Sequence, residues 1–178
     1  VDGFRLDAAK HMQYGFFTVW LDALRAATGR ELFSVGEYWT GSLPDLTGFI
    51  AHTDSRMSLF DVPLHYRFHE ISGANGSFDM RQLLEGTLVA ADPARAVTFV
   101  ENHDTQPGQS LSSPVSPWMK PLAYAVILLR EGGYPCVFYG DYYGVPKDGA
   151  APMRPWLDLL LRARKERAYG AQHDYFDH

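Results

Sequence analysis

The chain has 178 residues, of which 46% are hydrophobic, 14% aromatic and 21% charged, and its formal net charge is −5. This apolar content is sufficient for a folded core and excludes wholesale disorder. Because acidic residues outnumber basic ones, 21 to 16, no basic excess is present to bind phosphates, and nucleic acid is not expected as a partner. The single cysteine, Cys136, excludes a disulfide framework or a cysteine-based zinc site within the chain. The longest apolar stretch, around residues 122–129, is far shorter than the roughly 20 residues of a membrane span, so no membrane partner is expected.

Short apolar runs alternate with longer segments of helical periodicity along the chain. The runs that predict strands span 3–7, 32–37, 57–62, 96–102 and 136–140. The segments that predict helices span 13–28, 43–53, 63–71, 80–88, 118–130 and 153–167. Stretches rich in Gly, Pro or Ser predict loops at 73–76, 107–117 and 141–152. Trp118 and Trp156 lie on helical faces and are expected to pack in the core.

Strands that alternate with helices predict a parallel α/β sheet, and the near-continuous apolar strands suit burial on both faces. Five strands cannot close the usual eight-stranded barrel. The fold class expected is therefore α/β, a partial (β/α)8 TIM barrel, with a free-standing doubly wound sheet as the alternative. The chain begins at Val1, without Met or a signal peptide, and we expect it to be a piece of a larger protein.

Three carboxylates follow the ends of predicted strands. Asp7, Glu37 and Asp104 each lie at or just after such an end, the edge of a parallel sheet where substrates bind. Any one of them alone could equally be a helix N-cap or a loop carboxylate. Three of them, with Arg5 and His103 beside two, favour a catalytic site.

Paired carboxylates about 5 Å apart suit retaining glycoside hydrolysis, in which one attacks the anomeric carbon and the other transfers protons. Arg5 lies two residues before Asp7, so on a strand both side chains face the same side. Its charge would keep Asp7 ionised, although a structural ion pair is the alternative. His103 could bind a sugar hydroxyl or be structural. His65 and His69 lie four residues apart, and solvated or capping roles are favoured over a metal pair.

Three segments resemble signature blocks of the α-amylase family of glycoside hydrolases (family 13), and they occur in that family's order. They are Gly3-Phe-Arg-Leu-Asp-Ala-Ala-Lys-His11, Gly36-Glu-Tyr-Trp39 and Phe99-Val-Glu-Asn-His-Asp104. Further segments resemble the bacterial liquefying type: Phe60-Asp-Val-Pro-Leu-His-Tyr66, Asn102-His-Asp-Thr-Gln-Pro-Gly-Gln109, Lys120-Pro-Leu-Ala-Tyr124, Phe138-Tyr-Gly-Asp141 and the stretch from Ala168 to His178. The resemblance covers essentially the whole chain.

The resemblance implies a role for each matching site residue. Asp7 would be the nucleophile that forms a glycosyl-enzyme intermediate, Glu37 the general acid/base, and Asp104 a carboxylate that binds sugar hydroxyls and stabilises the distorted transition state. The other implied substrate-binding residues are Arg5, Lys10, His11, Trp39 and His103.

The resemblance also implies calcium as a cofactor. The backbone carbonyl of His11 matches a position that binds the structural calcium. Gly76 and Phe78, through their carbonyls, and His173 and Asp174 match part of a second calcium site.

By the family's order, residues 1–178 would be the C-terminal portion of the catalytic barrel, about strands four to eight. The N-terminal barrel half, the inserted calcium-binding domain and the C-terminal β-sandwich would be absent. The implied partner is an α-glucan polysaccharide or oligosaccharide, and the parent protein is expected to be monomeric. The compartment is not readable from the sequence, with secretion slightly favoured over the cytoplasm.

The leading hypothesis is endo-hydrolysis of α-1,4-glucosidic bonds in starch, with the isolated 178 residues nearly inactive. A related transglycosylase, a sucrose- or trehalose-type enzyme, a maltooligosaccharide-forming amylase and a non-catalytic carbohydrate-binding fragment are the alternatives. A magnesium-dependent lyase on the same barrel is disfavoured, because the guanidinium beside Asp7 would repel the metal.

Overall fold

The structure, a computed structural model, describes residues 1–176 except for the side chain of Asp148. Five strands form one sheet in chain order, and every neighbouring pair is parallel: β1 (Gly3–Leu6), β2 (Phe33–Gly36), β3 (Ser58–Phe60), β4 (Ala96–Phe99) and β5 (Tyr134–Cys136). The α-helices among the described residues are α1 (Tyr14–Thr28), α2 (Leu43–His52), α3 (Val62–Gly73), α4 (Leu88–Ala91), α5 (Lys120–Leu129), α6 (Tyr139–Tyr143) and α7 (Arg154–Glu166). Three 3₁₀ turns add to them: η1 (Ala9–His11), η2 (Met80–Gln82) and η3 (Pro146–Asp148).

The sheet curls into part of a barrel. The rings of Phe33 in β2 and Tyr134 in β5 meet with their centroids 5.4 Å apart, although β3 and β4 lie between those two strands. Phe60 and Phe99, from neighbouring strands, meet on the same concave side. This curvature confirms the predicted partial (β/α) barrel.

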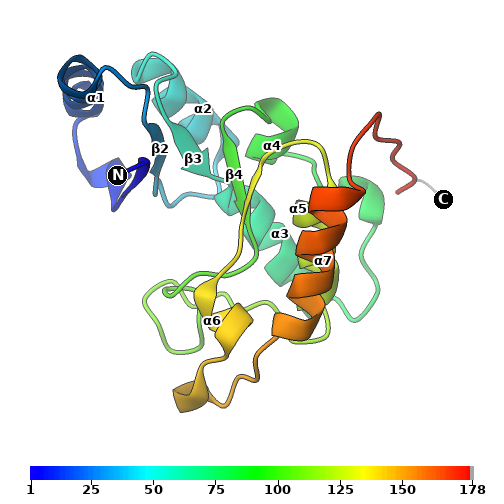
Figure 1. Cartoon of the computed structure of the whole chain (residues 1–178). Helices are drawn as coiled ribbons and strands as arrows, with labels where there is room; N and C mark the ends of the chain where they lie inside the picture. Colours follow the sequence, from blue (N-terminus) through cyan, green and yellow to red (C-terminus); the bar gives the residue numbers. More distant parts are fainter. Residues whose placement is uncertain (177–178) are drawn as a thin grey trace.

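The main core lies between the sheet and the helices that cover it. Its fully buried members include Leu59 from the sheet, Phe68 from α3 and Leu128 from α5. Figure 1 shows α1 and α2 at one end of the molecule, and α5 packed beside α7 at the other. No helix of the described residues is long and apolar enough to cross a membrane.

Local signals explain most of the helix boundaries. Gly29 ends α1 in the left-handed conformation, with φ of 65°. Ser42 caps α2 by accepting a hydrogen bond from the Asp45 amide, and Asp61 caps α3 in the same way through the Leu64 amide. The predicted helices 13–28, 43–53, 63–71, 118–130 and 153–167 are confirmed, with ends that shift by a few residues.

The helix predicted over 80–88 is wrong. A 3₁₀ turn, η2, occupies its start, and α4 begins only at Leu88. Gly86 breaks the segment with φ of 71°. Asp79 and Thr87 accept hydrogen bonds from nearby backbone amides, which starts two short elements in place of one long helix.

The strand predicted over 136–140 is displaced towards the N-terminus. β5 pairs with β4 only as far as Phe99 opposite Cys136, where β4 ends. Beyond this point the Phe138 amide donates to the Tyr124 hydroxyl over 3.3 Å, and the chain turns into α6. The predicted loop 141–152 therefore begins inside a helix.

The expectation that Trp118 and Trp156 pack in the core is also wrong. Trp118 is 50% exposed and Trp156 is 63% exposed. Only Leu157 is buried on α7, so Trp156, the residue before it, lies off the packed face. Helical periodicity alone does not show which apolar residue of a helix faces the core.

Candidate active site

The carboxyl ends of all five strands surround one hollow of about 160 Å³. Each strand contributes one residue from its concave side or from the position just after its end: Arg5, Glu37, Phe60, Phe99 and Cys136. The rest of the lining comes from segments that follow β4 and β5, namely Glu101, Asn102, His103, Val137, Phe138 and Tyr139. The sheet edge expected to carry chemistry therefore forms a concave site.

Arg5 joins two of the predicted catalytic carboxylates. Its Nη1 donates to Asp7 Oδ1 over 2.6 Å, and its Nη2 donates to Glu37 Oε1 over 2.8 Å. Arg5 lies in β1, Asp7 directly follows β1 and Glu37 directly follows β2, so the parallel pairing of β1 with β2 brings the three together. One guanidinium thus contacts both acids. The sequence spacing predicted the contact of Arg5 with Asp7 but not its contact with Glu37.

The two carboxylates differ in exposure. The Asp7 side chain is 73% exposed and that of Glu37 only 9%. Hydrogen bonding from Arg5, with its positive charge, lowers the pKa of Asp7 below the ordinary value, and nearby His103 adds to this effect. Asp7 is therefore an open, ionised carboxylate, whereas Glu37 is enclosed by the protein.

Backbone contacts hold Glu37 in place. Its amide donates to the Leu6 carbonyl over 2.8 Å, and its carbonyl accepts from the Ala9 amide over 2.9 Å. Its Oε2 also accepts from the Ala8 amide over 3.2 Å. A Cβ at the preceding Gly36 would lie 2.5 Å from the terminal methyl of Met57 and 3.0 Å from a methyl of Leu59, so these side chains would have to shift to accept a larger residue. These contacts fix the direction in which the carboxylate points.

His103 and Asp104 belong to the segment that follows β4. His103 lines the hollow, and its Nε2 lies 3.3 Å from Asp104 Oδ2. Neither Asp7 nor Asp104 lines the hollow, and the Asp104 carboxylate also accepts from the Ser110 hydroxyl over 3.3 Å. The structure thus brings Asp7 and Glu37 to Arg5, places His103 close enough to affect the pKa of Asp7, and places Asp104 beside His103.

The remaining predicted substrate residues, Lys10, His11 and Trp39, do not line the hollow. Lys10 donates from Nζ to the Trp39 carbonyl over 3.0 Å, and His11 is exposed at the end of η1. Trp39 is 8% exposed, donates from Nε1 to the Tyr66 hydroxyl and packs against Phe99. Its ring is therefore part of a small core in this structure, and its role as a sugar platform stays a prediction.

The predicted calcium residues have other contacts in this structure, and their calcium binding is not tested by it. Asp174 Oδ2 accepts from Arg130 over 2.7 Å, and the ring of Phe78 lies under the guanidinium of Arg67. Within residues 1–176, no group of three or more His, Cys, Asp or Glu side chains is placed to hold a metal ion. Calcium binding at His11, Gly76, Phe78, His173 and Asp174 remains a prediction from the resemblance.

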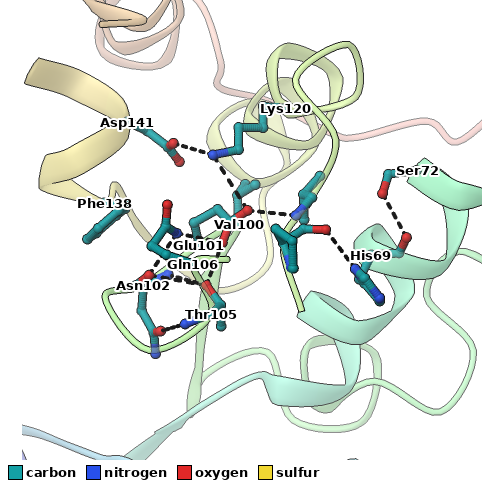
Figure 2. A network of polar contacts seen from close by, with 12 residues as sticks. His69, Ser72, Val100, Glu101, Asn102, Thr105, Gln106, Lys120, Phe138 and Asp141 are labelled. Atoms are coloured by element: carbon teal, nitrogen blue, oxygen red, sulfur yellow. Dashed lines mark hydrogen bonds and ion pairs between the residues drawn. The ribbon is translucent and has the colours of Figure 1, made fainter. Parts of the chain in front are cut away.

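The sequence interpretation missed a buried charged network beside the hollow. Glu101 is buried two residues after the end of β4, and Lys120 lies between Glu101 and Asp141 (Figure 2). Side chains two residues apart on a strand face the same side, so Glu101 faces the concave side as Phe99 does. This spacing could have identified Glu101 from the sequence.

His65 is neither solvated nor a helix cap. It is fully buried, with Nδ1 2.8 Å from the Val100 carbonyl and Nε2 2.8 Å from the Ser113 hydroxyl. Burial lowers the pKa of His65 to about 4, so the ring is neutral at pH 7. His69 is exposed, and its Nδ1 lies 2.7 Å from the Pro114 carbonyl. The two histidines therefore tie α3 to different residues of the chain after β4.

Curated proteins related to the chain match it along its full length. It is 55% identical over 178 residues to an α-amylase of Geobacillus stearothermophilus, and 54% identical over 181 residues to one of Bacillus licheniformis. It is 49% identical to a glucan 1,4-α-maltohexaosidase of Bacillus sp. (strain 707). All of this chain is covered in these matches, but only 32%, 35% and 34% of the relatives, so it spans about a third of their length.

Solved structures agree on the fold. An Anoxybacillus α-amylase superposes with a TM-score of 0.68 at 20% identity, covering 94% of this chain and 40% of that chain. A cyclomaltodextrin glucanotransferase superposes with a TM-score of 0.70 at 21% identity, covering 94% and 37%. No protein-family model matches the chain. Along its whole length the chain is thus similar to about a third of several bacterial α-amylases, and the solved structures share its barrel fold.

Proposed function

We propose that the protein that carries this chain hydrolyses internal α-1,4-glucosidic bonds of starch and related glucans with retention of anomeric configuration. The observation that carries the proposal is the placement of Asp7 and Glu37 on one guanidinium at the carboxyl ends of adjacent parallel strands. Sequence identity to named α-amylases supports the substrate class.

In the proposed first step, Asp7 attacks the anomeric carbon while the bond from that carbon to the leaving glycosidic oxygen breaks. Protonated Glu37 gives its proton to the departing oxygen. In the second step, Glu37 accepts a proton from water, and the resulting hydroxide displaces Asp7 from the same carbon. The exposure of Asp7 leaves its carboxylate open to a sugar, and Arg5 favours its ionised form.

Asp104 and His103 would bind sugar hydroxyls at the rim of the hollow. Calcium is proposed only from the resemblance, and no step of this reaction uses it. A divalent ion shared by Asp7 and Glu37, as a lyase would need, would compete with the guanidinium that already lies between them.

The test is chemical and uses the complete gene product that contains these residues. It is incubated with an activated fluorinated α-glucoside, which slows release of the glycosyl intermediate, and the labelled peptide is identified by mass spectrometry. We expect the label on Asp7. A label on another residue, or an inverted product anomer seen by NMR, would reject the assignment.

A paired variant tests the proton donor. Glu37→Gln should lower kcat by about 10²–10⁴-fold, the usual contribution of a general acid, while oligosaccharide binding persists. The matched control is Asp2→Asn, because Asp2 is an exposed carboxylate directly before β1 and forms an ion pair with Arg30. The control should keep its activity. The product profile from soluble starch separates endo-hydrolysis from maltohexaose formation and from glycosyl transfer.

A further inference from the structure

Glu101 is a buried carboxylate that the proposed reaction does not use. It lies two residues after the end of β4 and directly before Asn102, His103 and Asp104. None of its side-chain surface is exposed. Burial raises the pKa of Glu101, although the charge of Lys120 and the hydrogen bonds that the carboxylate accepts oppose this effect.

The two oxygens of Glu101 hold separate parts of the segment that follows β4. Oε2 accepts from the Thr105 hydroxyl and, over 2.9 Å, from Gln106 Nε2. Oε1 accepts from the Val115 amide over 2.6 Å and lies 3.5 Å from Lys120 Nζ. One carboxylate therefore joins the turn that carries His103 and Asp104 to the far end of the loop and to the start of α5 (Figure 2).

The turn itself is held by Asn102 and Thr105. Asn102 Oδ1 accepts from the amides of Asp104 and Thr105, each over 2.9 Å. The Thr105 hydroxyl accepts from the Asn102 amide over 3.0 Å while it donates to Glu101. His103 and Asp104 lie inside this small ring of contacts, and the Thr105 hydroxyl links the ring to Glu101.

Lys120 extends the network to the end of the neighbouring strand, β5. Its Nζ donates to Asp141 Oδ1 over 2.6 Å, and Asp141 Oδ2 accepts from the Tyr124 hydroxyl over 2.6 Å. The same hydroxyl accepts from the Phe138 amide, and Phe138 lines the hollow. The ends of β4 and β5 are thus connected by one buried chain of contacts.

We propose that Glu101 is a positioning residue that holds the Asn102–Asp104 turn against Lys120 and the end of β5, and so sets the placement of His103 and Asp104 toward substrate. This proposal rests on the function proposed above. Buried charges with this much desolvation are often no more stabilising than apolar residues of the same size. The network therefore contributes through the geometry it imposes, because one carboxylate satisfies donors from three segments at once.

The test compares Glu101→Gln with wild type in the complete gene product. The amide has the same shape but loses the charge and one acceptor oxygen, so the turn is expected to loosen. We expect kcat on a chromogenic maltooligosaccharide to fall about 100-fold, the size associated with a misplacement of about 1 Å, with KM within about twofold. Hydrogen exchange of the peptide that spans residues 102–106 should become faster.

The matched control is Asp61→Asn. Asp61 is also fully buried and accepts three backbone amide bonds, from Leu64, Leu88 and Val89, but it faces α3 and α4. The Asp61→Asn variant should have a lower melting temperature, with turnover and with hydrogen exchange at residues 102–106 unchanged. Unchanged kcat in Glu101→Gln, with a drop in melting temperature like that of Asp61→Asn, would overturn the proposal.

A second pair of variants covers the case in which Glu101→Gln fails to fold. Thr105→Val removes the hydroxyl that bridges Glu101 and Asn102, whereas Thr105→Ser keeps it. We expect Thr105→Val to lose turnover and Thr105→Ser to restore it; equal loss in both would reject the positioning role. If wild type hydrolyses no glucan, the proposed function fails, while unchanged exchange at 102–106 in Glu101→Gln would by itself reject the role of Glu101.

Discussion

Two pairs of carboxylates, each bridged by one cation, lie at the same edge of the sheet and differ in their access to water. Arg5 joins Asp7 and Glu37, and Lys120 joins Glu101 and Asp141. The Arg5 side chain is 38% exposed and that of Lys120 only 13%. Of the four carboxylates only Asp7 is open to solvent and to a substrate, whereas both Glu101 and Asp141 are buried and can act only on their neighbours. Each set consists of one cation and two carboxylates. The set around Arg5 forms the candidate active site, and the set around Lys120 holds the neighbouring segments in place.

The largest expected effect is a difference in unfolding free energy between variants that remove Lys120 and variants that remove Arg5. Lys120→Met leaves Glu101 and Asp141 buried without their cation, which costs about 3–5 kcal/mol of unfolding free energy. Arg5→Met should cost less, because Arg5 and Asp7 reach water, which can replace the lost contact. Urea unfolding of both variants measures the difference.

The control for this comparison is Lys165→Met, since Lys165 is an exposed lysine in the last turn of α7. It should leave the unfolding free energy within about 0.5 kcal/mol of wild type. A loss below about 1 kcal/mol in Lys120→Met would show that water enters the buried network and that the two pairs are alike.

The next effect concerns pH and the buried side of the molecule. Burial lowers the pKa of His65 to about 4, whereas an unfolded histidine has a pKa of about 6.5. Between these values the unfolded state binds more protons. The neutral His65 ring therefore makes its full contribution to the free energy of unfolding above about pH 6.5. This contribution falls by about 3 kcal/mol in all as the pH is lowered towards 4.

Urea unfolding at pH 7 and pH 4.5 tests this dependence. His65→Gln should unfold with a smaller pH dependence than wild type, because the titrating ring is gone. His69→Gln is the matched control, since His69 is exposed on the same helix, and it should keep the wild-type dependence. Equal pH dependence in wild type and His65→Gln would mean that His65 is not the group responsible.

The smallest expected effect concerns Arg5 and the two carboxylates that it contacts, Asp7 and Glu37. Arg5→Lys keeps a positive charge but cannot hold two carboxylates with one rigid fork. Losing one charge-assisted bond should lower kcat/KM by about tenfold. Because Arg5 lowers the pKa of Asp7, its replacement raises that pKa, and the acid limb of the pH profile should move to higher pH. An acid limb that stays in place would show that Asp7 does not control it.

Much of the fold was predictable because its signals are local. Apolar residues that repeat at helical spacing, and glycines such as Gly29 at helix ends, are read within a few neighbouring residues. The alternation of strands and helices indicated the parallel half-barrel, and it placed Asp7, Glu37 and Asp104 at one sheet edge. The segment 80–88 failed because side-chain caps at Asp79 and Thr87 outweighed its helical periodicity.

The sequence by itself determined the sheet edge where chemistry-bearing residues gather, because strand direction and the period of two follow from neighbouring residues. Only the tertiary structure decided that Asp7 is open, that Glu101 is enclosed and that Trp156 is exposed. The physical reason is that burial and charge pairing depend on contacts between segments distant in the chain, such as Arg5 with Glu37 and Lys120 with Asp141. A local sequence pattern does not show which of two similar carboxylates, such as Asp7 and Glu101, those contacts will bury.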